Sequence, residues 1–352
     1  MGRGTVAEPW RIAVFGTGTV GGHAARAVQL RGDMALVGAK VYTPSKAGQD
    51  VGELLGGTAI GIEAVDDVAG IVSAAPDAVI YAPNSPMHGE IFELLEAGVN
   101  VITTSGGYLF YPFPNAELTA ELEAACQVGG ASFHGTGVDP GFMPSRLPLV
   151  LTSWCRRIDR VKMTEAAHMV DYPSSTTLFD LMHFGHPLDP ANCTKGPIGE
   201  RIGVAFEAQV VQLVVGLGAK LERVEQHYEE APAPRTLQVA AGTIAEGTVA
   251  GQRWRWSGIV DGAPLVELEV NWILSDELPG WPKKHGWRVD IDGDPDVHCT
   301  LETGGGLNGD DECCIATAMQ AVNAIPVVCE AQPGVRTVLD LPVVHGRHLS
   351  NF

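Results

Sequence analysis

Short apolar runs alternate with segments of helical composition over the first 150 residues. The apolar runs are 11–15, 34–42, 77–82, 99–103 and 131–135, and the helical segments include 20–30, 88–97 and 117–128. Runs that are apolar at consecutive positions are typical of strands buried on both faces. Their alternation with helices predicts a parallel sheet that is covered on both sides. We therefore expect an α/β dinucleotide-binding type of domain over residues 8–150.

The pattern changes to alternation with a period of two after residue 160. It covers 161–167, 237–249, 253–260 and 265–273, and the turn sequence Asp-Gly-Ala-Pro separates the last two runs. This alternation predicts antiparallel hairpins with one covered face, and helices are expected at 175–184 and 198–215. We interpret 151–310 as an α+β domain with a mainly antiparallel sheet.

A mostly apolar segment over 312–331 predicts a long helix near the end of the chain. Pro326 should kink or end this helix, because proline lacks the N–H that an interior turn requires. We expect the helix and the tail, together residues 311–352, to return to the first domain.

Composition and charge narrow the class of protein. The chain of 352 residues is 45% hydrophobic and 18% charged, as in globular proteins. Its formal net charge of −19 disfavours nucleic acid and anionic membranes as partners. The sequence shows no stretch of about 18 uninterrupted apolar residues and no secretory signal. Its seven cysteines follow no paired spacing, so we expect a reduced, cytoplasmic protein.

Residues 16–21 read Gly-Thr-Gly-Thr-Val-Gly, the GxGxxG pattern, between a predicted strand and a predicted helix. In this context Gly16 permits a tight turn, Gly18 lets the backbone approach a pyrophosphate, and Gly21 allows close packing of helix and strand. The pyrophosphate would bind free amides at the positive end of the helix. We predict a dinucleotide site that also includes Thr17, Thr19 and Val20. A glycine-rich turn in an unrelated α/β fold is the alternative.

The segment after the second predicted strand bears on the choice between NAD and NADP. NAD-binding domains usually carry Asp or Glu there, and it holds the ribose hydroxyls. Here residues 41–46 read Val-Tyr-Thr-Pro-Ser-Lys, without an acid. Thr43, Ser45 and Lys46 are candidates to bind a 2′-phosphate, so NADP is the first choice and NAD the alternative. The rival interpretation of Lys46 is a solvated loop lysine.

Six segments carry motifs of a known family over almost the whole chain. They are GTGTVG (16–21), KAGQDVGELLG (46–56), AGVNVITT (97–104), GTGVDPGFMPSRLPL (135–149), YPSSTTLFDLMHFG (172–185) and AVNAIPVVCEAQPGVRTVLDLP (321–342). Together they resemble the dihydrodipicolinate reductase-like family, in the group of 2,4-diaminopentanoate dehydrogenase and the native amine dehydrogenases. The resemblance implies hydride transfer between NAD(P)H and a carbonyl or imine carbon, in a homodimer whose active site lies at the junction of two domains. It adds further cofactor-binding residues: Ala82, Pro83, Asn84, Thr103, Thr104, Ser105, Gly137 and Asn323.

Two features depart from the family pattern. Lysine-biosynthetic dihydrodipicolinate reductases carry paired histidines with a nearby lysine and a DAPSGT-like run, and both are absent here. The amine dehydrogenases place a glutamate just after the strand that matches 99–103, whereas residues 105–112 read SGGYLFYP. A carboxylate there would hold a cation and shift proton equilibria. Its absence favours reduction of a preformed imine or a ketone over activation of free ammonia.

Hydride transfer requires orientation, exclusion of water and a proton donor or base near the reacting atom. The candidates for that donor or base are Tyr108, Asp139, Tyr172 and His183. Three have a structural alternative: Tyr108 as a loop tyrosine, Asp139 as a turn residue and His183 as a histidine bonded to backbone. Apolar pocket walls are expected from four residues that equally suit an ordinary core, namely Phe142, Met143, Leu178 and Met182.

The sequence predicts no metal site. His183 and His186 are separated by a glycine and followed by a proline, which breaks helical register. The acidic run at 290–296 lacks the EF-hand order and is interpreted as a solvated turn. The cysteines lack a CxxC pair.

The function predicted first is NADP(H)-dependent oxidoreduction at C=N or C–NH₂ bonds of a small, mainly hydrophobic ketone, imine or amine. The alternatives are a ketone or alcohol oxidoreductase on the same scaffold, and a non-catalytic dinucleotide sensor. Trp254 and Trp256, expected to be exposed, would permit the dimerisation that the resemblance implies.

Overall fold

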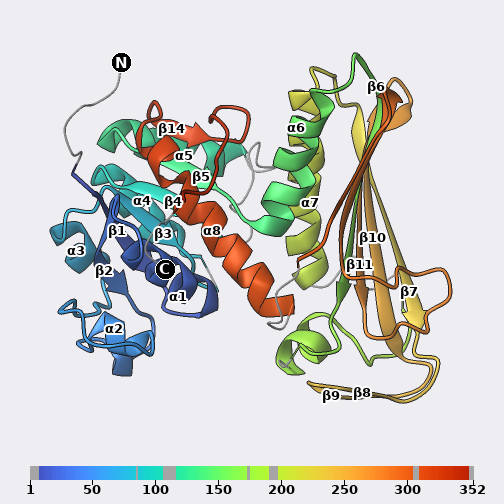
Figure 1. The fold of residues 1–352 in the computed structure, drawn as a ribbon, viewed down its shortest axis with the longest axis horizontal. Coiled ribbons are helices and arrows are strands. Elements are labelled where there is room, and N and C mark those ends of the chain that lie inside the picture. The colour runs from blue at the N-terminus through green and yellow to red at the C-terminus, as the bar shows by residue number, and fades with distance from the viewer. Residues whose placement is uncertain are drawn as a thin grey trace. The chain divides into compact units, whose positions relative to one another are not determined.

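The computed structural model describes residues 8–84, 86–105, 116–172, 175–189, 197–303 and 309–348 (Figure 1). The chain divides into two compact units, which we call unit 1 (Met1–Gly141 with Asp311–Phe352) and unit 2 (Phe142–Asp310). The division falls after Gly141, before the position 150 expected from the sequence.

Unit 1 is built on a six-stranded parallel sheet in the order β14-β5-β4-β3-β1-β2. Its strands are β1 (Trp10–Phe15), β2 (Met34–Lys40), β3 (Ala78–Tyr81), β4 (Asn100–Thr103), β5 (Ser132–Gly135) and β14 (Gly334–Arg336). Because β2 lies on one side of β1 and β3 on the other, the loops that follow β1 and β3 diverge. In parallel α/β sheets this reversal of strand order leaves a crevice at the carboxyl ends of the strands.

Helices cover both faces of this sheet, as the continuous apolar runs predicted. Ile12 and Val14 of β1 belong to a core shared with α1 and α8, and the alternate residues Ala13 and Phe15 belong to a second core with α3, α4 and α5. The helices are α1 (Thr19–Gln29), α2 (Val51–Leu54), α3 (Val68–Ser73), α4 (His88–Glu96), α5 (Ala116–Gly129) and α8 (Gly309–Cys329).

Helix α8 returns to the first domain, as expected. Ala318, Val322 and Ile325 are fully buried in the core of unit 1. Within the described residues, 312–329 is the one helical stretch long and apolar enough to cross a membrane, and core helices of globular proteins meet the same criterion. Pro326 lies inside the helix, which continues to Cys329, so the proline does not end it.

Unit 2 contains a six-stranded mixed sheet in the order β13-β12-β6-β11-β10-β7, in which only β6 and β11 pair in parallel. Its elements are α6 (Leu147–Thr152), β6 (Arg157–His168), α7 (Pro197–Gly216), β7 (Arg223–Pro232), β8 (Leu237–Val239), β9 (Gly242–Ile244), β10 (Val249–Val260), β11 (Ala263–Ile273), β12 (Gly286–Asp294) and β13 (Val297–Leu301). The predicted α+β domain with a mainly antiparallel sheet is confirmed.

The alternating run 237–249 forms the antiparallel hairpin β8–β9, which turns before Gly242, and its last residue begins β10. One prediction of local structure in unit 2 was wrong. The acidic run is not a solvated turn, because Asp290, Asp292 and Asp294 lie on β12. They alternate with the buried Val289 and Ile291, so the alternation of the strand, rather than the acidic composition, determines the structure.

The two tryptophans expected to be exposed are buried. Trp254 and Trp256 are 2% and 0% exposed. Their rings stack, and Phe206 of α7 stacks on Trp256 at 4.7 Å between ring centroids. The expectation failed because alternation on β10 does not reveal which face of the strand is covered, and α7 covers the face of the tryptophans.

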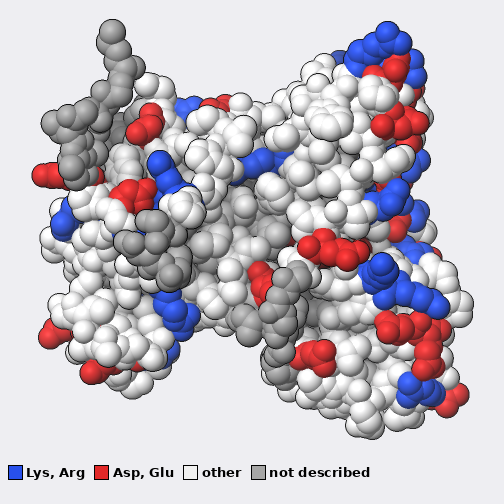
Figure 2. All heavy atoms as spheres, in the orientation of Figure 1, with Lys and Arg blue, Asp and Glu red and all other residues white. Residues whose placement is uncertain are grey.

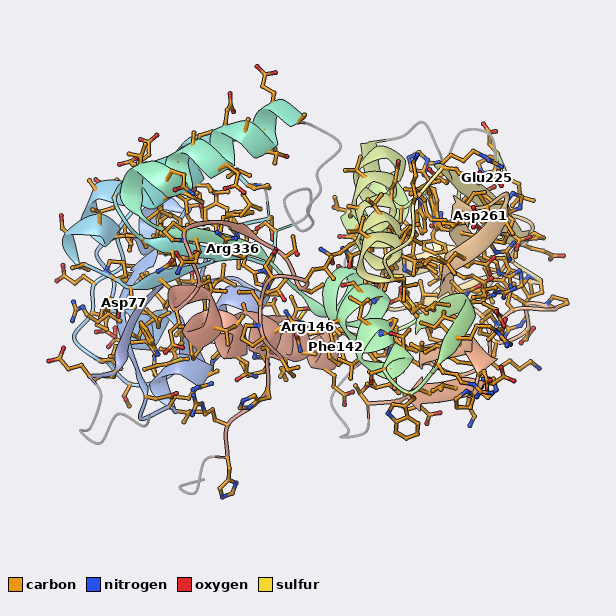
Figure 3. The ribbon with its side chains drawn as sticks, turned by 90° about the horizontal axis from the view of Figure 1, so that it is seen from above. Asp77, Phe142, Arg146, Glu225, Asp261 and Arg336 are labelled. Carbon is orange, nitrogen blue, oxygen red and sulfur yellow. The ribbon has the colours of Figure 1, made fainter. Side chains whose placement is uncertain are left out.

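On the opposite face of this sheet, basic and acidic side chains of neighbouring strands lie next to one another, and blue and red side chains alternate over this part of the surface in Figure 2. Glu269 of β11 accepts hydrogen bonds from Lys162 of β6 and Arg255 of β10, both at 3.0 Å. Two further acidic residues of unit 2 are labelled in Figure 3: Glu225 lies on β7, and Asp261 lies in the turn between β10 and β11.

Candidate dinucleotide site

The glycines of the loop after β1 each meet a different steric requirement. Gly16 has φ of +87°, and a Cβ there would lie 3.1 Å from the carbonyl oxygen of Ala82. A Cβ on Gly21 would lie 1.9 Å from the carbonyl oxygen of Gly16, so α1 can approach β1 only without one. A Cβ on Gly18 would meet nothing within 4 Å. Open space at Gly18 is what a bound pyrophosphate requires.

The first turn of α1 is suited to an anion. Gly18 is its extended N-cap residue and provides no side-chain cap, and the turn holds no acidic residue. Thr19, Val20 and Gly21 open the helix, and the first amides of a helix have no intrahelical acceptor. These amides and the helix dipole favour a phosphate group.

A pocket of about 440 Å³ lies beside this loop. Its lining residues follow the carboxyl ends of β1, β2 and β3, and they are Gly16, Thr17, Gly18, Tyr42, Thr43, Lys46, Ala82, Pro83, Asn84 and Met87. The pocket therefore lies at the reversal of strand order, where parallel α/β sheets bind their ligands. The sequence did not identify Tyr42 and Met87 as site residues. Tyr42 is the last residue of the apolar run 34–42, and this place at the end of a predicted strand was the available signal for it.

Lys46 contributes a cation to the wall of this pocket. It ends the short 3₁₀ helix Pro44–Lys46, and its Nζ lies 3.5 Å from the hydroxyl oxygen of Thr17 in the glycine loop. Ser45, predicted with it, does not line the pocket, and its carbonyl oxygen accepts a hydrogen bond from Gln49.

A largely buried cluster of charged and phenolic groups borders the pocket. Lys40, the last residue of β2, forms an ion pair of 2.9 Å with Glu90 of α4, and the two side chains are 6% and 9% exposed. The second carboxylate oxygen of Glu90 accepts hydrogen bonds from the hydroxyls of Tyr42 at 2.6 Å and Tyr81 at 2.8 Å. We call Lys40, Tyr42, Tyr81 and Glu90 the carboxylate cluster.

Both phenols in the carboxylate cluster remain hydrogen-bond donors at neutral pH. Burial raises the pKa of Tyr42, and its hydrogen bond to Glu90 raises that pKa further. Burial is also the largest cause of the raised pKa of Tyr81. Deprotonation would place a second anion beside the carboxylate, which is unfavourable in a buried position.

Except for Asn323, the other predicted cofactor residues lie at the carboxyl ends of β3, β4 and β5 or in the loops that follow them. The hydroxyl of Thr103 donates to the carbonyl of Tyr81 at 3.1 Å, and the hydroxyl of Ser105 donates to the carbonyl of Pro83 at 2.7 Å. The amide of Thr104 also donates to Tyr81. These bonds fix the loop that carries Ala82, Pro83 and Asn84. A Cβ on Gly137 would lie 2.9 Å from the carbonyl oxygen of Pro140.

Asn323 is not brought to this pocket. Its side-chain oxygen accepts a hydrogen bond of 2.9 Å from Arg31, which follows the carboxyl end of α1. The helix of 11 residues separates that end from the glycine loop by about 16 Å.

The candidate catalytic residues fall in different parts of the chain. Tyr108 lies outside the described residues. Asp139 belongs to unit 1, and its Oδ1 atom is buried. Tyr172 belongs to unit 2, where it packs against the core cluster that contains Leu178 and Met182. His183 has φ of +62°, and its ring centroid lies 5.1 Å from that of His186.

The residues expected as pocket walls are largely core. Leu178 is fully buried, Met182 is 8% exposed and Met143 is 1% exposed. Phe142, labelled with Arg146 in Figure 3, is partly buried in the segment before α6. Across the described parts of the chain, no three His, Cys, Asp or Glu side chains group as a metal site would require.

Comparisons with known proteins agree with this geometry. The chain is 29% identical to an amine dehydrogenase of Streptomyces virginiae over 94% of this chain and 95% of that protein. It is 24% identical to the 2,4-diaminopentanoate dehydrogenase of Acetoanaerobium sticklandii, over 96% and 94% of the two chains. The structure of an amine dehydrogenase from Mycobacterium smegmatis matches with a TM-score of 0.79 and 26% identity, over 97% of this chain and 98% of that one.

The glycine loop, the pocket beside it and these similarities make the protein a nicotinamide-dinucleotide-dependent oxidoreductase. The model of the 2,4-diaminopentanoate dehydrogenase C-terminal domain family matches residues 142–350, more than half of the chain. The chain therefore belongs to the family of proteins that carry the 2,4-diaminopentanoate dehydrogenase C-terminal domain.

Proposed function

We propose that this protein transfers hydride between NADP(H) and the carbon of a C–N bond in a small amine or imine. The observation that carries the proposal is the pocket at the ends of β1, β2 and β3, with Lys46 on its wall, in a chain of this family. The names of its relatives, amine dehydrogenase and 2,4-diaminopentanoate dehydrogenase, support a C–NH₂ substrate.

The charges around the pocket support NADP over NAD. An NAD-selective domain offers a carboxylate to the ribose hydroxyls at the end of its second strand. Here residues 41–46 carry no acid, and the carboxylate of Glu90, which accepts from Tyr42, is already bonded by Lys40 and two phenols. The ammonium of Lys46 remains on the pocket wall, where it could donate a charge-assisted hydrogen bond to a 2′-phosphate.

The bound dinucleotide supplies or accepts the hydride. The glycine loop and the amides of α1 would hold its pyrophosphate, and Lys46 with Thr43 its 2′-phosphate. Orientation by these groups is the protein's main contribution, because hydride transfer needs little covalent chemistry from side chains. We propose that Asp139 donates or accepts the proton. Two observations support this: its Oδ1 atom is buried, and the residue lies in the segment that follows β5.

The absence of a carboxylate in residues 105–112 supports a preformed imine, rather than a ketone with free ammonia, as the substrate for reduction. Phe142 is apolar and only partly buried, and this supports a mainly hydrophobic substrate. The homodimer and the cytoplasmic location expected from the sequence stay predictions.

The test is consumption of NADPH and NADH at 340 nm with a panel of ketones and cyclic imines, each with and without excess ammonium. We expect cyclic imines to turn over with NADPH regardless of ammonium. Turnover of ketones only with ammonium would contradict the preference for a preformed imine and indicate an amine dehydrogenase. Tight NADPH binding without turnover of any amine, imine or ketone would overturn the proposed reaction. If the Asp139→Asn variant retained activity near that of the wild type, Asp139 would be excluded from proton transfer.

A further inference from the structure

Tyr42 is held in one orientation at the edge of the proposed cofactor pocket. Its hydroxyl donates to Glu90 at 2.6 Å, and the Nζ of Lys40 lies 3.7 Å from the centroid of its ring. The residue as a whole is still 41% exposed, and it lines the pocket together with Met87. One end and one face of the ring are therefore occupied by protein, and the exposed part borders the pocket.

The partners of Tyr42 are themselves fixed. Glu90 is 8% exposed, and Tyr81 is fully buried. The hydroxyl of Tyr81 donates to Glu90 at 2.8 Å and accepts a hydrogen bond from the amide of Met87 at 2.9 Å. Each polar group at the centre of the carboxylate cluster thus has a partner, which restricts the rotamers of all its members.

A rigid aromatic ring with one open face binds a flat π system better than a mobile one, because less side-chain freedom is lost on binding. Aromatic rings bind nucleic-acid bases by stacking, and the stacking tolerates different bases. The base at one end of a dinucleotide is such a group. The pocket beside Tyr42 also contains the glycine loop, so a base on this ring and a pyrophosphate on the loop would belong to one ligand.

We infer that Tyr42 is the stacking platform for the adenine of the dinucleotide, and that Lys40, Glu90 and Tyr81 are positioning residues that hold the platform. The inference rests on the proposed dinucleotide cofactor and extends it to a residue that recognises the base. Lys40 also explains why the ring does not turn into the space of the base, since its ammonium attracts the ring face.

The test compares a probe that carries adenine with a probe that lacks it. The dissociation constants of NADPH and of reduced nicotinamide mononucleotide are measured by fluorescence titration of the full chain. For Tyr42→Ala we expect the Kd of NADPH to rise by about 10- to 100-fold, the range for loss of one base stack. The Kd of the mononucleotide and the kcat at saturating NADPH should each stay within about 2-fold of wild type.

Three further variants separate the platform from its supports. Tyr42→Trp retains a flat ring and should keep the Kd of NADPH within about 3-fold of the wild type. Tyr42→Phe retains the ring over Lys40 but loses the bond to Glu90, so we expect a rise of about 2- to 5-fold. Trp154→Ala removes an exposed aromatic ring that does not line this pocket. It is the matched control and should leave the Kd of both probes within about 2-fold of the wild type.

The outcomes distinguish this inference from the proposed function. Equal effects of Tyr42→Ala on both probes, or a Kd of NADPH within 2-fold of the wild type, would overturn the platform while the proposed function stands. A wild-type chain that binds the mononucleotide and NADPH with the same affinity would also overturn it, because the adenine would then contribute nothing. Failure of the wild type to bind either probe would overturn the proposed cofactor and the platform with it.

Discussion

The pair Gly21 and Gly22 offers a direct test of the cofactor loop, because two adjacent glycines in one helix differ in their surroundings. A Cβ on Gly21 would lie 1.9 Å from the carbonyl oxygen of Gly16, whereas a Cβ on Gly22 would lie 3.5 Å from its nearest neighbours. In Gly21→Ala the contact must lengthen to at least 3.0 Å, so the start of α1 has to move away from β1 by about 1.1 Å. Overpacking of this kind costs about 1–3 kcal/mol.

The expected changes in melting temperature have opposite signs. For a domain the size of unit 1, 1 kcal/mol shifts Tm by roughly 2–4 °C, so Gly21→Ala should lower Tm by roughly 2–12 °C. Gly22→Ala meets only ordinary contacts and gains helix propensity, worth up to about 1 kcal/mol. Its Tm should be unchanged or higher by roughly 2–4 °C.

Thermal unfolding monitored by circular dichroism measures these shifts, and titration with NADPH measures the consequence for the site. In Gly21→Ala the displaced amides should lose at least one charged hydrogen bond to phosphate, which raises the Kd by about tenfold or more. Gly22→Ala should bind NADPH as the wild type does. A Gly21→Ala variant with the Tm and the Kd of Gly22→Ala would refute the assignment of Gly16–Gly21 as a close-packed phosphate loop.

Three further predictions concern single side chains. Lys46→Ala should raise the Kd of NADPH by about 10- to 150-fold through loss of one charged hydrogen bond and leave the Kd of NADH almost unchanged; equal effects in titrations with both cofactors would contradict a 2′-phosphate site. Glu90→Leu leaves Lys40 buried without its partner and should cost about 3–5 kcal/mol in the free energy of unfolding. The double variant Lys40→Met/Glu90→Leu should recover the part of this loss that comes from the unpaired Lys40, while Tyr42 and Tyr81 still lack their acceptor; a urea titration in which the double variant loses as much as the single variant would contradict the role of the ion pair. Burial raises the pKa of Cys126 to about 11, so its thiolate fraction at pH 8 is roughly one in a thousand. Thiol labelling mapped by mass spectrometry should therefore miss Cys126 in the folded chain and detect it in urea, and labelling of Cys126 in the folded chain would contradict its burial.

The glycine loop could be predicted from the sequence because its requirements are local. Gly16, Gly18 and Gly21 meet their constraints within one strand, one turn and one helix, and the spacing of three glycines already encodes that geometry. The same holds for the two-sided burial of β1, since apolar residues at the four consecutive positions 12–15 leave no face for solvent.

The carboxylate cluster could not be predicted in the same way. Lys40 and Glu90 lie 50 positions apart in the sequence, and their ion pair depends on how α4 packs against the sheet. Lys40 lies inside the apolar run 34–42, and the sequence alone names no partner for it, although it is 5% exposed. The buried tryptophans of β10 failed for a related reason, because the partner that covers a strand face comes from a distant helix.

The proposed preference for NADP rests on which charges near β2 are neutralised and which are not. The chain carries a formal charge of −19, but charges beyond a Debye length of about 8–10 Å are largely screened, so the pocket responds to its own walls. There the charge of Lys40 is balanced by Glu90 at 2.9 Å, so the carboxylate of Glu90 is not available to the ribose hydroxyls of NAD. In the proposed complex, Lys46 on the pocket wall would supply the positive charge that a 2′-phosphate meets. An anionic protein can in this way present a locally cationic site, provided that the carboxylate of Glu90 is already bonded.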